Sequence, residues 1–369
     1  MSKICLIGNS GLKSGGADGQ TSKVRLYLRK IKDEGLDVDF VDLSNFTRRP
    51  LRVFGLIRKA IKKCDRIVLI SAERGCKVLI PYINCINKRL KKPFILPLVG
   101  TSVLHYSIDH MDDERQKSFF STNGYSRVRA SKSLKKNLAK ITWILPETHL
   151  ISDVFRSFYG IGNVVTLNNF RDIVPIKHNT ACKNRIKKIV YFSRVMPTKG
   201  IFDLVYACKG LKENFDYKLD IYGPLYLTAK DEKAFYGLLD NRIRYLGTVD
   251  PSQAISILAK YDLLVFPTRF ACEGTPGVIV ESFLAGTPVL SSSFPQARAL
   301  INDGYDSLLY DFLNANDLKE KLSSAISNSL LLETLRNNVQ SSSQKFTYEH
   351  ERNTFLKYVC GIECNEKPK

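Results

Sequence analysis

Two glutamates stand eight positions apart in a short segment that is rich in glycine and proline. Glu273 precedes the run Gly274-Thr275-Pro276-Gly277, and Glu281 falls about one turn into the helical pattern that follows from Val278. Glycine lets the backbone approach a ligand closely, and proline suits the entry of a helix. The free N–H groups and the dipole of such a helix start attract an anion. The segment therefore predicts an anion site, beside which Glu281 can accept hydrogen bonds from vicinal hydroxyls.

Two cations lie on an earlier loop that follows an apolar strand pattern. Arg194 and Lys199 are five residues apart, on a turn that proline and glycine interrupt. A guanidinium fork and an ammonium point charge can together clamp a diphosphate without a metal ion. A glycosidase pair, with an acid and a base or nucleophile across one bond, is the alternative for Glu273 and Glu281. We reject it because hydroxyl groups of a bound ligand, together with the two cations, account for both glutamates. A glycosidase pair would leave both carboxylates without a compensating charge.

Strands and helices must position these loops, and the hydrophobic pattern predicts two series of them. Strands are expected at 3–7, 38–43, 66–71, 93–99, 188–192, 218–222, 243–246, 263–266 and 288–291. Helices are expected at 20–31, 51–63, 79–90, 202–211, 278–285 and 346–358. Such alternation indicates parallel sheets with helices on both faces, where ligands bind beyond the carboxyl ends of the strands. The expected fold class is therefore α/β, with two Rossmann-like domains.

The length of the chain also favours two domains. Its 369 residues exceed what one hydrophobic core usually organises. The alternation of strand and helix patterns is interrupted around 167–170 and then resumes. We therefore expect a first domain at 1–170 and a second at 171–345.

The second half resembles the retaining GT-B glycosyltransferases of the GT4 type, the glycosyltransferase group 1 family. The segment 273–281, followed by Ala285-Gly286-Thr287-Pro288-Val289, is similar to the E-x7-E signature of that family. The segment 192–200 is similar to its phosphate-binding loop. Further matching positions are Tyr222-Gly223, Leu246-Gly247 and Tyr261-Asp262. The resemblance implies a GT-B fold, in which two domains face a central cleft and the closing segment, 346–369, crosses back to the first domain.

The resemblance also implies roles for single residues. Arg194 and Lys199 would hold the donor diphosphate, Glu273 would contact the transferred sugar, and Glu281 would bind the ribose hydroxyls. The other donor-binding positions would be Gly274, Thr275, Pro276, Gly277, Val278 and Gly223. No metal or other cofactor is expected, because family members of this type need none. His105, with His110 next, is the nearest candidate for the histidine that the family often keeps at its cleft.

The net charge of +20 is unevenly distributed. Residues 1–170 carry 30 Lys and Arg against 14 Asp and Glu, whereas residues 171–369 carry 26 against 22. A basic half attracts an anionic partner, either a membrane surface or nucleic acid, although a solvated basic face is the plain alternative. The basic segments 51–63, 88–92 and 127–140 suit an anionic leaflet. A nucleic-acid-binding protein is the alternative of another class, but no helix-turn-helix, RNP or zinc-finger pattern is present.

We expect a cytoplasmic protein, peripheral on the inner face of the cytoplasmic membrane. No apolar stretch is long enough for a signal peptide or a membrane span, and the nine scattered cysteines favour reduced thiols.

The resemblance implies transfer of a hexose or N-acetylhexosamine from a nucleotide diphosphate sugar to a glycan acceptor. We favour UDP over GDP-mannose. The basic first half fits a lipid-linked acceptor, such as a polyprenyl diphosphate sugar of O-antigen, capsule or exopolysaccharide synthesis. A further alternative is a GT-B protein that has lost turnover and only binds its ligand. The presence of all four charged residues, Arg194, Lys199, Glu273 and Glu281, argues against it.

Overall fold

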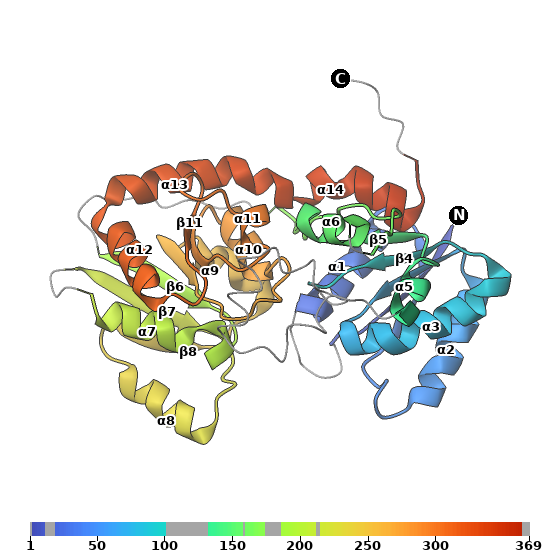
Figure 1. Cartoon of the computed structure of the whole chain (residues 1–369), viewed down its shortest axis with the longest axis horizontal. Helices are drawn as coiled ribbons and strands as arrows, with labels where there is room; N and C mark the ends of the chain where they lie inside the picture. The colour runs from blue at the N-terminus through green and yellow to red at the C-terminus, as the bar shows by residue number, and fades with distance from the viewer. Residues whose placement is uncertain are drawn as a thin grey trace. The chain divides into compact units, whose positions relative to one another are not determined.

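The chain folds into two compact units (Figure 1). The computed structural model describes residues 2–11, 19–100, 132–157, 159–173, 186–211 and 215–363. Among these, the first unit contains the residues up to 100, those from 132 to 168, and the returning segment 351–363. The second unit contains the described residues from 169 to 350. The chain therefore passes between the units after Asn168 and again after His350.

A parallel sheet of five strands forms the centre of the first unit. Its order is β2-β1-β3-β4-β5. The strands are β1 (Lys3–Gly8), β2 (Asp37–Asp42), β3 (Arg66–Ile70), β4 (Phe94–Pro97) and β5 (Trp143–Leu145). The helices described in this part of the chain are α1 (Gly19–Asp33), α2 (Pro50–Lys63), α3 (Glu73–Leu90), α5 (Lys132–Leu138) and α6 (His149–Ser157). Strand β2 lies at one edge of the sheet and is half-buried, whereas β3 and β4 are buried along almost their whole length.

Helix α3 begins at Glu73, so the start predicted at Leu79 was wrong. Gly75 and Pro81 both weaken the helical signal, because each has a low intrinsic helix propensity. Cys76 and Leu79 are nevertheless buried at 2% and 0% exposure. Burial of these side chains therefore outweighs the local preference.

The returning segment packs on the first unit. Helix α14 (Tyr348–Thr354) continues into the π-helical turn Phe355–Cys360. The ring of Phe355 lies 5.1 Å from that of Tyr27 in α1, and Arg66 Nε in β3 donates to the carbonyl oxygen of Val359 at 3.2 Å. The helix predicted over 346–358 starts only at Tyr348, because Thr347 is extended and pairs with Arg171 as an isolated parallel bridge.

A parallel sheet of six strands forms the centre of the second unit, in the order β11-β10-β9-β6-β7-β8. The strands are β6 (Lys187–Phe192), β7 (Tyr217–Tyr222), β8 (Ile243–Gly247), β9 (Leu263–Phe266), β10 (Val289–Ser292) and β11 (Leu308–Tyr310). The described helices are α7 (Ile201–Lys209), α8 (Ala229–Leu238), α9 (Ala254–Leu258), α10 (Gly277–Leu284), α11 (Ala297–Leu300), α12 (Ala315–Ser327) and α13 (Ser329–Ser342).

Helices cover both faces of this second sheet. Ile189 and Tyr191 of β6 join the core formed with α7 and α12, whereas Val190 joins the core formed with α9 and α10 (Figure 1). Successive strand residues point to opposite faces, so this alternation requires apolar side chains at consecutive positions. The predicted α/β class with two parallel sheets is confirmed.

None of the helices in the described part of the chain is both long enough and apolar enough to cross a bilayer. The seven cysteines among the described residues are free thiols, and only Cys85 of these is exposed.

Candidate active site

Two loops that follow the neighbouring strands β6 and β9 approach each other closely. Gly200, in the first loop, has φ of 70°, and a Cβ atom there would stand 1.8 Å from the carbonyl oxygen of Pro267 in the second. Only glycine tolerates both the conformation and the contact. The approach brings Lys199 of the first loop to Glu273 of the second.

Lys199 and Glu273 form a buried ion pair. Lys199 Nζ donates to Oε1 of Glu273, and the two side chains are 10% and 11% exposed. The same Oε1 accepts a hydrogen bond from Thr268 Oγ1 at 2.8 Å. The Lys199 ammonium also lies 5.7 Å and 5.6 Å from the ring centres of Phe266 and Phe270, where cation–π attraction applies. The ammonium and the carboxylate are therefore held in place before any ligand arrives.

Arg194 is exposed at the start of the loop after β6. Its guanidinium lies 5.9 Å from the ring centre of Tyr226, and no carboxylate in the described part of the chain pairs with it. Gly223, after β7, has φ of 137°, and a Cβ atom there would stand 1.9 Å from the carbonyl oxygen of Ser193. Gly223 thus lets the β7 loop lie against the residue that precedes Arg194.

The first turn of α10 presents its backbone amides without a side-chain cap. The helix runs over Gly277–Leu284, and Pro276 occupies the N-cap position, where it provides no side-chain cap. Asn169 Nδ2 donates to the carbonyl oxygen of Thr275 at 3.1 Å and so fixes the approach to the helix. Gly274 is buried in the same turn. Uncapped N–H groups at a helix start are donors available to an anion.

Glu281 is paired with Arg171, a residue that the sequence reasoning missed. Arg171 Nε lies 3.1 Å from Glu281 Oε1, and the two side chains are 17% and 19% exposed. Arg171 Nη1 donates to Asn169 Oδ1 and to the carbonyl oxygen of Phe170, each at 2.9 Å. Burial raises the pKa of Glu281 above its ordinary value, and the charge of Arg171 opposes that rise.

Gly277 makes room for this guanidinium. A Cβ atom at Gly277 would stand 2.6 Å from Arg171 Nη2. The backbone of Arg171 is fixed as well, since its N–H donates to the Phe346 carbonyl oxygen at 2.9 Å and its own carbonyl oxygen accepts from the Tyr348 N–H at 3.0 Å. The one sequence signal for Arg171 is its position as the first charged residue after the uncharged stretch 157–170.

The structure thus gives each carboxylate its own cation. It brings Lys199 to Glu273 and Arg171 to Glu281, and it leaves Arg194 exposed on the same loop as Lys199. Val278 follows Gly277 in the first turn of α10 and is half-buried. The candidate histidines at positions 105 and 110 lie outside the described residues. Two carboxylates that are each neutralised by a cation are a poor acid and base pair, which agrees with the rejection of a glycosidase site.

A comparison with known protein families points to the same half of the chain. Residues 176–344 match the family Glycosyl transferases group 1. The uncharacterized glycosyltransferase MJ1178 of Methanocaldococcus jannaschii is 32% identical over 160 residues, which are 43% of this chain and 44% of that protein. The match therefore spans less than half the length of that relative.

Solved structures extend the likeness to nearly the whole fold. Anabaena Alr3699/HepE in complex with UDP and glucose has a TM-score of 0.69 at 15% identity, covering 98% of this chain and 100% of that one. Sucrose-phosphate synthase (tll1590) from Thermosynechococcus elongatus has a TM-score of 0.73 at 15% identity, covering 98% and 99%. The lipopolysaccharide outer core galactosyltransferase WaaB has a TM-score of 0.68 at 16% identity, covering 97% and 99%. The chain therefore has the GT-B fold, and its residues 176–344 match the glycosyl transferases group 1 family of transferase enzymes.

Proposed function

We propose that this protein is a retaining glycosyltransferase of the GT4 type that transfers a hexose or N-acetylhexosamine from a nucleotide diphosphate sugar. The observation that carries the proposal is the buried Lys199–Glu273 pair, which lies on loops at the carboxyl ends of β6 and β9. The uncapped start of α10 follows Glu273 by four residues. Cations, free amides and a carboxylate on neighbouring loops are what a sugar diphosphate requires.

The chemistry follows from where negative charge develops. Cleavage of the bond between the sugar and the phosphate leaves charge on the departing diphosphate, and prepositioned donors stabilise that charge most in the transition state. Lys199, Arg194 and the first amides of α10 supply these donors. The leaving phosphate can take the proton of the acceptor hydroxyl in a front-side attack, so no protein base is required.

The two glutamates keep one oxygen each for hydroxyl groups. In Glu273, Oε1 accepts from both Lys199 and Thr268, and within the described residues Oε2 has no partner. In Glu281, Oε1 accepts from Arg171 Nε, and Oε2 is likewise without a partner in the described chain. We assign Oε2 of Glu273 to a hydroxyl of the transferred sugar and Oε2 of Glu281 to the ribose.

UDP is the donor nucleotide that we propose. The support is that Anabaena Alr3699/HepE, a structural neighbour, was solved in complex with UDP and glucose and in complex with UDP-glucose. No metal or other cofactor is part of the proposal, because Lys199, Arg194 and the α10 amides supply the positive charge.

We further propose a lipid-linked glycan acceptor, of the kind used in O-antigen, capsule or exopolysaccharide synthesis. The support is the basic first half of the chain, since residues 1–170 carry 30 Lys and Arg against 14 Asp and Glu. A second support is the name of one structural neighbour, a lipopolysaccharide outer core galactosyltransferase. The protein would act at the inner face of the cytoplasmic membrane, where a basic surface meets anionic lipids.

The test is to incubate the protein with membranes and a panel of labelled nucleotide sugars and to measure label in the extracted lipid. Label from a UDP-sugar and not from GDP-mannose is expected, and NMR of the product should show that the anomeric configuration of the donor is kept. Glu281→Ala should abolish transfer, whereas Glu320→Ala, at an exposed glutamate on α12, should not. The absence of transfer from every donor, with unchanged nucleotide binding in Glu281→Ala, would refute the proposal.

A further inference from the structure

Helix α2 of the first unit has one buried face and one strongly basic face. Its buried residues are Val53, Ile57, Ala60 and Ile61. Its exposed cations are Arg52, Arg58, Lys59, Lys62 and Lys63, and the exposed Arg48 and Arg49 immediately precede it. The helix contains no acidic residue.

These seven cations are not neutralised within the protein. None of them forms an ion pair with a carboxylate anywhere in the described chain. On most protein surfaces, lysines and arginines of a helix are interspersed with acidic residues one turn away. A helix face with cations alone projects a positive field that attracts an anionic partner.

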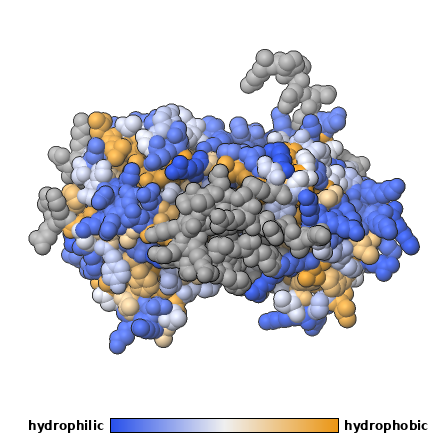
Figure 2. Space-filling model, viewed as in Figure 1, coloured by the Kyte–Doolittle hydropathy of each residue, from blue (hydrophilic) through white to orange (hydrophobic). Residues whose placement is uncertain are grey.

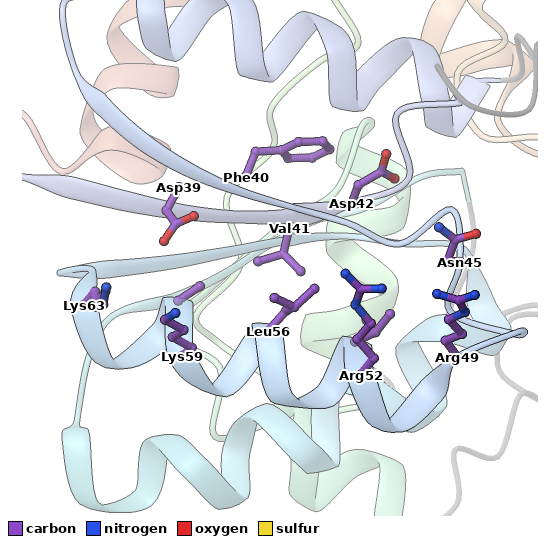
Figure 3. A pocket seen from close by; sticks show the side chains of 12 residues that line it. Asp39, Phe40, Val41, Asp42, Asn45, Arg49, Arg52, Leu56, Lys59 and Lys63 are labelled. Atoms are coloured by element: carbon purple, nitrogen blue, oxygen red, sulfur yellow. The ribbon is translucent and has the colours of Figure 1, made fainter.

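A groove of about 480 Å³ runs between α2 and the edge strand β2 (Figure 3). Its basic lining residues are Arg49, Arg52, Lys59 and Lys63, and its acidic ones are Asp39 and Asp42. Asp42 is already used inside the protein, since it accepts from Ser10 Oγ at 3.1 Å and from the Ser44 N–H at 2.9 Å. The groove therefore keeps an excess of positive charge, and Leu56 lies in the middle of its α2 wall (Figure 3).

Leucines stand among these cations. Leu51, in the first turn of α2, is 84% exposed, the largest exposed fraction of any large hydrophobic residue described, and Leu56 is 47% exposed. Figure 2 shows hydrophobic residues mixed with hydrophilic ones over α2. A leucine this exposed gains free energy only when an apolar medium covers it.

We infer that the basic face of α2, with Leu51 and Leu56, docks on an anionic lipid bilayer. The cations would pair with lipid phosphates, and Leu51 would insert at the level of the acyl chains, as in amphipathic helices that lie in a membrane interface. A bilayer accounts for both the charges and the leucines, whereas a nucleic acid backbone accounts only for the charges. The face of α2 would be the membrane-facing surface of the proposed glycosyltransferase. The inference rests on the proposed function only in taking a membrane as the partner.

Sedimentation with vesicles tests the inference on the full-length protein. We expect the protein to bind phosphatidylcholine vesicles that contain phosphatidylglycerol and to bind pure phosphatidylcholine vesicles at least about tenfold more weakly. The double variant Lys59→Glu and Lys63→Glu should lose at least about tenfold in affinity for the anionic vesicles. The matched control is Lys230→Glu with Lys233→Glu on α8, which changes the net charge equally on exposed residues of the second unit.

A second pair of variants tests the leucine. Leu51→Ser should weaken binding to anionic vesicles several-fold, whereas Leu330→Ser, at a leucine 70% exposed on α13, should leave it unchanged. Equal losses from the α2 and α8 charge variants would overturn the inference, because net charge alone would then explain binding. The inference would also be overturned if Leu51→Ser bound anionic vesicles as tightly as the wild type and duplex DNA or RNA displaced the vesicles. Vesicle binding requires no sugar donor, so this result and the outcome of the transfer assay are independent.

Discussion

The pair Arg171–Glu281 allows a quantitative prediction about stability. Arg171→Met keeps the length and apolar volume of the side chain but leaves the Glu281 carboxylate, 19% exposed, without its cation. Removing one partner of a buried ion pair usually costs about 3–5 kcal/mol, because the remaining charge is uncompensated. Both partners here keep nearly a fifth of their surface exposed, and water screens such charges in part. We therefore expect a loss of about 2–3 kcal/mol in the free energy of unfolding at pH 8.

The loss should depend on pH with a definite sign. Burial already raises the pKa of Glu281, and removing Arg171 takes away the charge that opposes this rise. A carboxyl group whose pKa is higher in the folded state stabilises the fold below its unfolded pKa of about 4.3, and this stability is lost as pH rises through the folded pKa. The difference between Arg171→Met and the wild type should therefore be largest at pH 8 and should shrink as the pH falls toward 5.

Urea unfolding at pH 8 and at pH 5.5 measures this difference. The cycle with Glu281→Gln isolates the pair, because glutamine has no charge to leave uncompensated and the double variant should recover most of the loss. Trp143 is the only tryptophan and belongs to the first unit, so its fluorescence transition serves as an internal control. Far-UV circular dichroism reports on both units. An equal loss at both pH values, or an equal loss in the Glu281→Gln background, would refute the reasoning.

Three further predictions concern other positions. Lys199→Ala should lower kcat by about 10²–10³-fold, because it removes one of the proposed donors to the leaving diphosphate; kcat within threefold of wild type in the transfer assay would contradict this. Gly200→Ala should destabilise the second unit by more than about 1 kcal/mol, measured as a lower Tm, because φ is 70° and its Cβ would meet the carbonyl oxygen of Pro267. Burial raises the pKa of Glu351 to about 7, although the hydrogen bond from Asn168 opposes this rise. The protonated Glu351 side chain therefore stabilises the fold at low pH, and this stabilisation is lost as the pH rises through about 7. Glu351→Gln should flatten that fall in urea midpoints between pH 5 and pH 8, and an unchanged pH profile would count against it.

The sequence by itself predicted nine of the eleven strands in the described chain, all except β5 and β11, and most of the candidate site residues. The strand predicted at 263–266 coincides with β9, and the strand at 188–192 differs from β6 by one residue. Both strands are buried, so their apolar runs are unambiguous, and loops after parallel strands are where ligands bind. Lys199 and Glu273 could be named for the same reason, since each follows such a strand on a loop that contains glycine.

The tertiary structure alone decided which charges meet. Glu281 and Arg171 are 110 residues apart, and Lys199 and Glu273 are 74 apart, so no local pattern relates the members of either pair. Thr347 is extended rather than helical because it pairs with Arg171, and that pairing holds the backbone from which Arg171 reaches Glu281. Helical and strand periodicity are properties of neighbouring residues, whereas an ion pair depends on how distant segments pack. The two carboxylates were therefore visible in the sequence, and their partners became visible only in the folded chain.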